Sequence, residues 1–202
     1  MCAGDYVGYY YEPNKVIEML NEWDWIGVSG NHEEMLLRWE NETHRKEIKK
    51  KYGSGIQIAS KTLSKELISQ LCCLTYKKKI VIDKYKIIIC HGSPWDYDFY
   101  IYPDAEKSII NKLFTFDTDF DLLLYGHTHY PVKWEKGKQK IINPGSVGQP
   151  RDKKPGVCWA IWDSEDNSID FFREDYDLTP VIEMCKQYDP ELHYLADVLL
   201  RT

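Results

Sequence analysis

The chain has 202 residues, a formal net charge of -6 and 43% hydrophobic residues, values typical of a globular protein with a substantial buried core. No apolar run approaches the roughly 20 residues that cross a bilayer, and no signal-peptide pattern opens the sequence, so we expect a cytoplasmic protein without a membrane partner. The acidic balance predicts no dedicated nucleic-acid surface, because phosphate-backbone binding needs clustered basic side chains. Six cysteines without paired spacing predict free thiols.

The first part of the chain is predicted to be mainly helical. Residues 13–22 place their apolar side chains on one side of a short helix, and residues 25–28 then favour a strand. The pattern turns helical again over residues 33–51 and over residues 55–74. A helical half with one strand is therefore expected before residue 75.

The middle of the chain is predicted to be rich in strands. A turn around Lys84 joins two strand candidates, and a loop rich in Trp and Tyr precedes a helix over residues 104–114. The expected strands cover residues 80–83, 86–90, 121–125, 131–135, 138–142, 157–163 and 168–173.

The C-terminal stretch, residues 179–200, is predicted to be helical, with Pro190 as the point where a break would fall. Helices mixed with strands, followed by closely spaced strands, indicate an α/β protein in which one sheet packs on another. We interpret residues 1-202 as a single domain.

Four short segments share one design, in which an apolar strand ends beside a glycine and a metal-binding side chain follows. They are Gly4-Asp5, Gly30-Asn31-His32-Glu33, Cys90-His91-Gly92 and Gly126-His127-Thr128-His129. Because ligands collect at the carboxyl ends of strands in α/β sheets, we expect the four segments to converge. Their carboxylate, amide and imidazole groups suit Zn²⁺, Mn²⁺ or Fe better than Ca²⁺ or Mg²⁺.

Each segment also has an ordinary structural explanation. Asp5 suits a turn, and Asn31 with Glu34 three residues later suits a helix N-cap with its capping-box partner. His91 suits a hydrogen-bonded histidine at the end of a strand. The fourth segment is harder to explain in this way, because two imidazoles in a loop just beyond a strand can face two neighbouring metals.

Taken together and in this order, the segments resemble the calcineurin-like metallophosphoesterase family, specifically its small bacterial and archaeal phosphodiesterase-like branch. The resemblance covers nearly the whole chain and extends to residues 28–33, 91–94 and 142–151. It implies a calcineurin-like four-layer α/β/β/α sandwich of two mixed sheets flanked by helices. It also implies a metal-dependent phosphoesterase that hydrolyses phosphomonoesters or phosphodiesters through in-line attack by a metal-bridged hydroxide.

The resemblance implies two divalent metal ions, with Mn, Fe, Zn and Ni as candidates. Asp5 resembles the carboxylate that bridges the two ions. The remaining ligands of the second ion would be Asn31, His91 and His127. His129 resembles a ligand of the first ion.

Two further roles concern the substrate. His32, which is next to a ligand but is not one itself, resembles the family's catalytic histidine, which stabilises phosphoryl oxygens or protonates the leaving group. Arg151 could donate to a substrate phosphate, or could equally form a surface salt bridge. The aromatic loop over residues 95–102 could stack a flat group, which makes a small phosphoester, a nucleotide among others, the expected partner.

The sequence departs from the family at its N-terminus. Family members begin with an apolar strand that ends in Asp-x-His, whereas no Asp of this chain has a His two positions later. We therefore expect the first strand and helix of the fold to be missing, so that the first metal keeps only Asp5 and His129 and the second is better supported. Activity would then be weak or absent, and exposed sheet edges could support a homo-oligomer.

Two other classes of function stay open at this point. A catalytically impaired binding scaffold with the same fold would agree with an incomplete metal centre. A single structural zinc held by Asp5, His91 and His127 would instead predict a closed four-ligand shell and unfolding on chelation.

Overall fold

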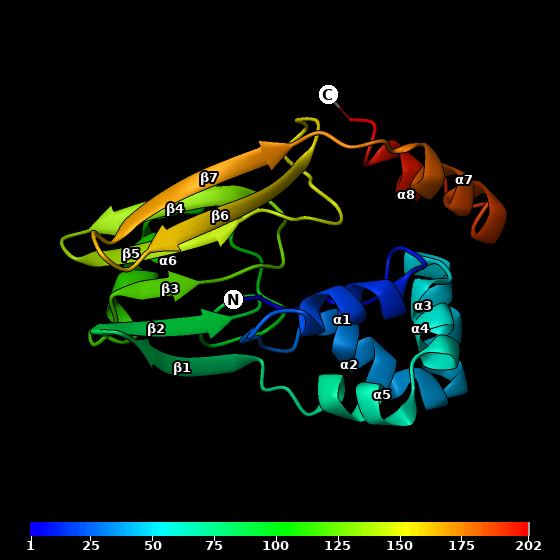
Figure 1. The fold of residues 1–202 in the computed structure, drawn as a ribbon, viewed down its shortest axis with the longest axis horizontal. Helices are drawn as coiled ribbons and strands as arrows, with labels where there is room; N and C mark the ends of the chain where they lie inside the picture. Colours follow the sequence, from blue (N-terminus) through cyan, green and yellow to red (C-terminus); the bar gives the residue numbers. More distant parts are fainter. Residues whose placement is uncertain (202) are drawn as a thin grey trace.

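The computed structural model describes residues 1–201, in which a group of helices lies beside a group of strands (Figure 1). The helical group comes first in the chain. It consists of α1 (Pro13–Asn21), α2 (Asn31–Leu37), the 3-10 helix η1 (Arg38–Glu40), α3 (Glu42–Tyr52), α4 (Gly55–Thr62) and α5 (Lys65–Cys72). The mainly helical start of the chain is thus confirmed.

Two stretches predicted as continuous helices are each interrupted by a residue that caps a new helix. Asn41 interrupts the first stretch, and its side-chain oxygen accepts hydrogen bonds from the backbone of Thr43 and His44, in the first turn of α3, at 3.0 and 3.2 Å. Ser64 does the same for α5, accepting from the backbone N–H of Leu67. These polar side chains offer the backbone N–H groups an alternative partner, which favours a helix start over a helix interior.

The strands that follow form a five-stranded mixed sheet in the order β1-β2-β3-β5-β4. Its members are β1 (Lys77–Ile82), β2 (Tyr85–Cys90), β3 (Leu122–Leu124), β4 (Pro131–Lys136) and β5 (Gln139–Pro144). β2, β3 and β5 run parallel in the centre, with Ile88 opposite Leu123 and Leu123 opposite Ile141. The two edge strands, β1 and β4, are antiparallel to their neighbours.

The two faces of this sheet are covered differently. Ile88 and Leu123 pack with Leu113 of the helix α6 (Lys107–Thr115). The neighbouring residues Ile87 and Leu122 point the other way, as alternate residues of a strand must, and pack toward the β6 and β7 strands. β6 (Val157–Asp163) and β7 (Ser168–Glu174) form an antiparallel pair, so one sheet packs on another.

Burial on both faces explains the continuous apolar runs of β2 and β3, which are typical of central parallel strands. The predicted α/β class, with a mixed sheet flanked by helices, is confirmed. One strand prediction was wrong: residues 25–28 form only an isolated parallel bridge between Cys2 and Gly27. A single bridge gives too few backbone hydrogen bonds to define a strand.

The chain ends in two helices, α7 (Thr179–Tyr188) and α8 (Tyr194–Asp197), separated around Pro190 as predicted. Cys185 of α7 and Leu195 of α8 pack in one cluster with Tyr11 and with Ile58 of α4, at the end of the molecule that carries the helical group (Figure 1). The Tyr11 hydroxyl donates to Asp189 Oδ2 at 2.9 Å, and the backbone N–H of Ser54 donates to the same oxygen at 2.8 Å. Hydrogen bonds therefore connect the C-terminal helices to the N-terminal loop, which also carries the predicted site residue Asp5.

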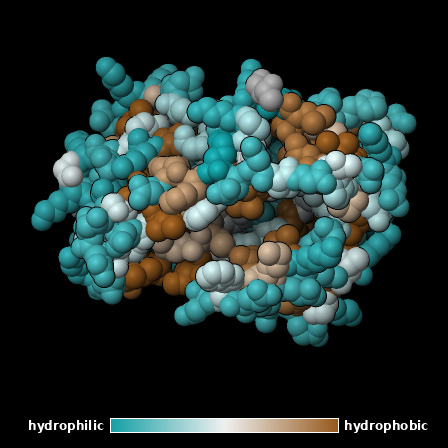
Figure 2. Space-filling model, turned by 45° about the horizontal axis from the view of Figure 1, so that its top comes forward, coloured by the Kyte–Doolittle hydropathy of each residue, from teal (hydrophilic) through white to brown (hydrophobic). Residues whose placement is uncertain are grey.

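Within residues 1–201, each of the six cysteines is a free thiol, and no helix has the length and apolar character needed to cross a membrane. Much of the outer surface is hydrophilic, and apolar side chains gather around a hollow in the middle of the face shown in Figure 2.

Candidate metal centre

Four chain segments bring their polar side chains to one place at the edge of the five-stranded sheet. His91 follows β2 directly, and His127 lies in the loop that follows β3. Since β2 and β3 are parallel neighbours, their carboxyl ends lie side by side. Asn31 is the first residue of α2, and Asp5 lies in the N-terminal loop. The predicted convergence of the four segments is therefore observed.

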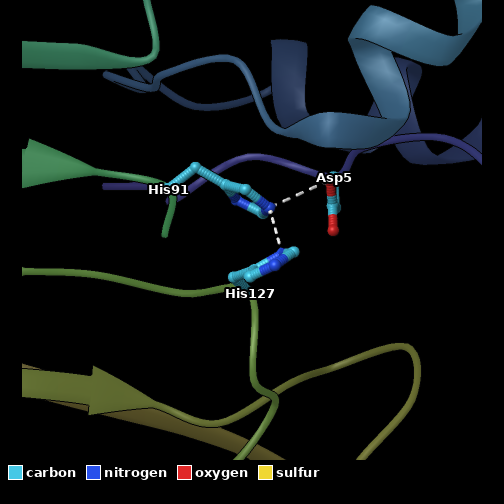
Figure 3. Close-up of side chains that lie close together, drawn as sticks. All are labelled: Asp5, His91 and His127. Atoms are coloured by element: carbon cyan, nitrogen blue, oxygen red, sulfur yellow. Dashed lines mark hydrogen bonds and ion pairs between the residues drawn. The ribbon is translucent and has the colours of Figure 1, made fainter. Parts of the chain in front are cut away.

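The side chains of Asp5, His91 and His127 point toward one another (Figure 3). One potential ligand atom of each lies within 4.8 Å of the other two. His91 Nε2 lies at the centre, 3.4 Å from Asp5 Oδ1, 3.0 Å from His127 Nδ1 and 2.9 Å from Asn31 Oδ1. Such a group of buried oxygen and nitrogen atoms is the donor set of a divalent metal.

The hydrogen bonds around His91 show why this arrangement fits a cation. His91 Nδ1 lies 2.6 Å from the carbonyl oxygen of Ala3, which can only accept, so Nδ1 carries the proton. In the neutral ring, Nε2 then presents a lone pair toward the oxygens of Asn31 and Asp5. Facing lone pairs repel unless a positive charge lies between them, so the residues present fit a metal ion.

The charge states of the neighbouring groups favour the same conclusion. Burial and the nearby His91 lower the pKa of His127 to about 4, so its ring is neutral at pH 7 and keeps a lone pair. Burial raises the pKa of Asp5, but the neighbouring imidazoles of His91, His32 and His129 and a hydrogen bond from the His32 backbone N–H outweigh this effect and lower it to about 2. Asp5 is therefore an ionised carboxylate, the form that binds metals.

Backbone conformation also distinguishes this region. Asp5, His127 and His129 have positive φ angles of 60°, 66° and 64°, in the left-handed region that side chains other than glycine seldom adopt. Such strain persists only where surrounding contacts enforce it, and it gathers at functional sites. At Gly30 a Cβ atom would lie 2.2 Å from Asp5 Oδ1, so only glycine allows this close approach.

Glu33 has a role that the sequence analysis did not assign. Its fully buried carboxylate accepts hydrogen bonds from the backbone N–H groups of Asp5, Tyr6 and Gly30, at 2.9, 2.8 and 2.8 Å. Gly30 is the N-cap of α2 and Glu33 is its N3 residue, so the interpretation of Asn31 as an N-cap paired with Glu34 was wrong. The spacing of three residues between Gly30 and Glu33, which is that of a capping box, was the available signal in the sequence.

The second new residue is Asn143 at the end of β5. Its buried side-chain amide donates to the Gly126 carbonyl at 2.8 Å and to the Thr128 hydroxyl at 3.0 Å. It thereby holds the turn that carries His127 and His129. Asn143 lay within a segment that the sequence analysis identified only by resemblance, and nothing in its spacing indicated this contact.

The other predicted site residues, His32, His129 and Arg151, lie around the side chain of Tyr9. They are next to the close group formed by Asp5, His91 and His127. The rings of Tyr9 and His32 are 4.5 Å apart, and those of Tyr9 and His129 are 6.3 Å apart. Arg151 donates to the Tyr9 hydroxyl at 2.7 Å and to Gln149 Oε1 at 2.9 Å. His129 is not part of the close group, and its Nδ1 donates to the carbonyl of Gln149 at 2.7 Å.

His32 is fully buried, and its Nδ1 forms no hydrogen bond with any residue in the range 1–201. Burial lowers the pKa of its imidazole, although the charge of Asp5 opposes this effect. For His129, burial and the Arg151 charge lower the pKa to about 3, so its Nε2 keeps a lone pair at neutral pH.

This fold and donor set define a calcineurin-like phosphoesterase, and the chain belongs to that superfamily, whose domain description matches residues 1–167. An uncharacterized protein from Methanocaldococcus jannaschii is 30% identical over 203 residues, covering 90% of this chain and 78% of the relative.

Two solved structures share the fold. A hypothetical protein from Pyrococcus horikoshii has a TM-score of 0.82 and 21% identity, covering 97% of this chain and 82% of that chain. A metallophosphoesterase from Sphaerobacter thermophilus has a TM-score of 0.77 and 24% identity, covering 98% of this chain and 86% of that chain. The mixed sheet flanked by helices is thus the metallophosphoesterase fold.

Proposed function

We propose that this chain is a metal-dependent phosphoesterase that hydrolyses small phosphomonoesters or phosphodiesters by in-line attack of water on phosphorus. The observation that supports this most is the convergence of potential ligand atoms around His91 Nε2, from the side chains of Asp5, Asn31 and His127. Membership of the calcineurin-like phosphoesterase superfamily agrees with it. The substrate class includes nucleotides.

We assign Asp5, Asn31, His91 and His127 to one ion, and Asp5 with His129 to the other. Two divalent ions there, with Mn, Fe, Zn and Ni as candidates, would supply an activated water and neutralise charge on the attacked phosphate. The site that contains Asn31, His91 and His127 has four protein donors with Asp5, whereas the site that contains His129 has two. We therefore expect the ion in the four-donor site to bind more tightly.

His32 is the proposed catalytic residue. Its Nδ1, which forms no hydrogen bond among the described residues, and its lowered pKa keep a neutral imidazole beside Asp5, able to donate to a phosphoryl oxygen or to the leaving group. Tyr9 packs on this ring and fixes its plane. Arg151 supplies the nearby positive charge, held in place by Tyr9 and Gln149, for a substrate phosphate.

We further propose that residues 1-202 act as one domain. The contacts of Asp189 with Tyr11 and Ser54 support this, because they join the C-terminal helices to both the N-terminal loop and the start of α4.

The test is hydrolysis of bis(p-nitrophenyl) phosphate with and without Mn²⁺, in the native chain and in His32→Ala. We expect turnover that needs the metal and falls at least about a hundredfold in the variant. Equal background rates in both proteins would contradict the proposal and favour a binding scaffold. Unfolding on chelation alone would instead favour a structural zinc.

A further inference from the structure

A groove of about 250 Å³ opens beside the candidate metal centre, between one face of α2, one face of α3 and the aromatic loop after β2. On α2 the lining residues include Asn31 and Glu34, three positions apart, and on α3 they include His44, Glu47 and Ile48. Residues at these spacings share one helix face, so the two helices present a continuous wall.

The groove is continuous with the proposed catalytic site. Asn31 lines it and also lies 2.9 Å from His91 Nε2. Asp98 lines it from the other side, with Oδ1 3.4 Å from His127 Nε2. A phosphate held by the metal ligands would therefore extend an ester group into this groove.

The charges of the groove disfavour an anionic group. Arg38 is its one arginine, and its Nε donates to Glu34 Oε1 at 2.6 Å, so this positive charge is already paired. Glu47 and Asp98 add two further carboxylates. A second phosphate would be repelled here, whereas a neutral group that donates hydrogen bonds would be accepted.

The shape and the unused polar atoms of the groove favour a planar group. Tyr52 and Tyr97 each contribute a half-buried ring, and the Tyr52 ring also lies 5.4 Å from that of His32. Among the described residues, no group forms a hydrogen bond with the buried Nδ1 of His44. The volume is below the roughly 300 to 1,000 Å³ of pockets for drug-sized ligands, so it fits one ring system rather than a dinucleotide.

We propose that this groove binds the base of a nucleoside phosphate, with Tyr52 and Tyr97 against the ring faces and His44 and Glu47 on its polar edge. This proposal rests on the proposed phosphoesterase function and states which group is esterified to the substrate's phosphate, namely a nucleoside. Bases suit such a site because every base has an aromatic face that stacks on tyrosine and carries hydrogen-bonding groups at its edge.

The test compares AMP with ribose 5-phosphate, which has the same phosphate and sugar but no base. Binding of each to the Mn²⁺-loaded chain is measured by calorimetry, and each is also measured as an inhibitor of bis(p-nitrophenyl) phosphate hydrolysis. We expect AMP to bind at least about fivefold more tightly, the minimum that stacking of one base provides. Phosphocholine, a cationic ester of similar size, should bind no better than ribose 5-phosphate.

Glu47→Trp fills the groove from an exposed position, and Glu42→Trp is its matched control on the opposite side of α3. Glu47→Trp and His44→Ala should each remove most of the AMP advantage, whereas Glu42→Trp should preserve it. Equal affinities for AMP and ribose 5-phosphate, or tighter binding of phosphocholine, would overturn the base-binding proposal even if the diester is hydrolysed. If the chain binds AMP more tightly than ribose 5-phosphate but shows no metal-dependent hydrolysis, the enzymatic function is contradicted and the base-binding proposal is not.

Discussion

Replacing Glu33 by Gln tests whether one buried carboxylate organises the metal centre. The change preserves the size of the side chain but removes its charge and turns one oxygen into an N–H₂ donor. Glu33 Oε2 accepts from both Asp5 and Gly30, and Oε1 accepts from Tyr6. A glutamine can keep its oxygen on only one side, so at least one backbone N–H must lose its acceptor.

The magnitude follows from these three bonds. A buried N–H without a partner costs about 1–3 kcal/mol, and hydrogen bonds to a charged acceptor are each about 1 kcal/mol stronger than neutral ones. Part of this is offset, because burial and the Asp5 charge raise the pKa of Glu33 to about 7 and so disfavour its ionised form. We expect the variant to lose about 2–4 kcal/mol of unfolding free energy.

Urea unfolding of the metal-free chain measures this loss, and calorimetry with Mn²⁺ measures the effect on the site. Because Glu33 fixes the backbone of Asp5, metal affinity should fall about 10- to 100-fold. Glu34→Gln is the matched control, since Glu34 forms a partly exposed ion pair with Arg38 worth at most about 1 kcal/mol. If the two variants have the same stability and the same metal affinity, the reasoning about Glu33 is refuted.

Three other predictions follow from the same geometry. Gly8→Ala should lower phosphodiester turnover at least about tenfold, because its φ is 108° and a Cβ atom there would lie 1.8 Å from His32 Nδ1; unchanged turnover would argue against a catalytic His32. Asn143→Ala should cost about 2–3 kcal/mol in urea unfolding, because it leaves buried partners unpaired; a loss below about 0.5 kcal/mol would contradict this. Burial lowers the pKa of His127 to about 4 and of His129 to about 3, so the unfolded chain, with histidine pKa values of about 6.5, takes up protons first. The metal-free chain should therefore lose stability as the pH falls below about 6.5, and stability that is constant down to about pH 5 would exclude this linkage.

The fold could be predicted from the sequence wherever a local pattern decides it. The apolar runs that became β2 and β3 were recognised because burial on both faces leaves no polar position. Helix interruptions at Asn41 and Ser64 were missed, although Asn and Ser side chains favour a helix start over a helix interior. The strand expected at residues 25–28 did not form, because a strand needs a paired neighbour and this segment pairs with Cys2 through one bridge only.

The candidate site was likewise predicted only in part from the sequence. In the sequence, glycine beside a polar residue at a predicted strand end already indicated that Asp5, Asn31, His91 and His127 would converge. The same patterns could not identify Tyr9, whose contact with both His32 and His129 depends on a loop folding back over α2.

What the sequence determined by itself is the chemistry: which strands end in metal-binding groups and which family of folds would gather them. Chain connectivity and side-chain type carry that information locally. Only the tertiary structure decided that Asn31 Oδ1 and Asp5 Oδ1 both face His91 Nε2, and that Glu33 holds three backbone donors from two segments. Most of those contacts join residues far apart in the chain, whose separation in sequence does not determine their distance in space.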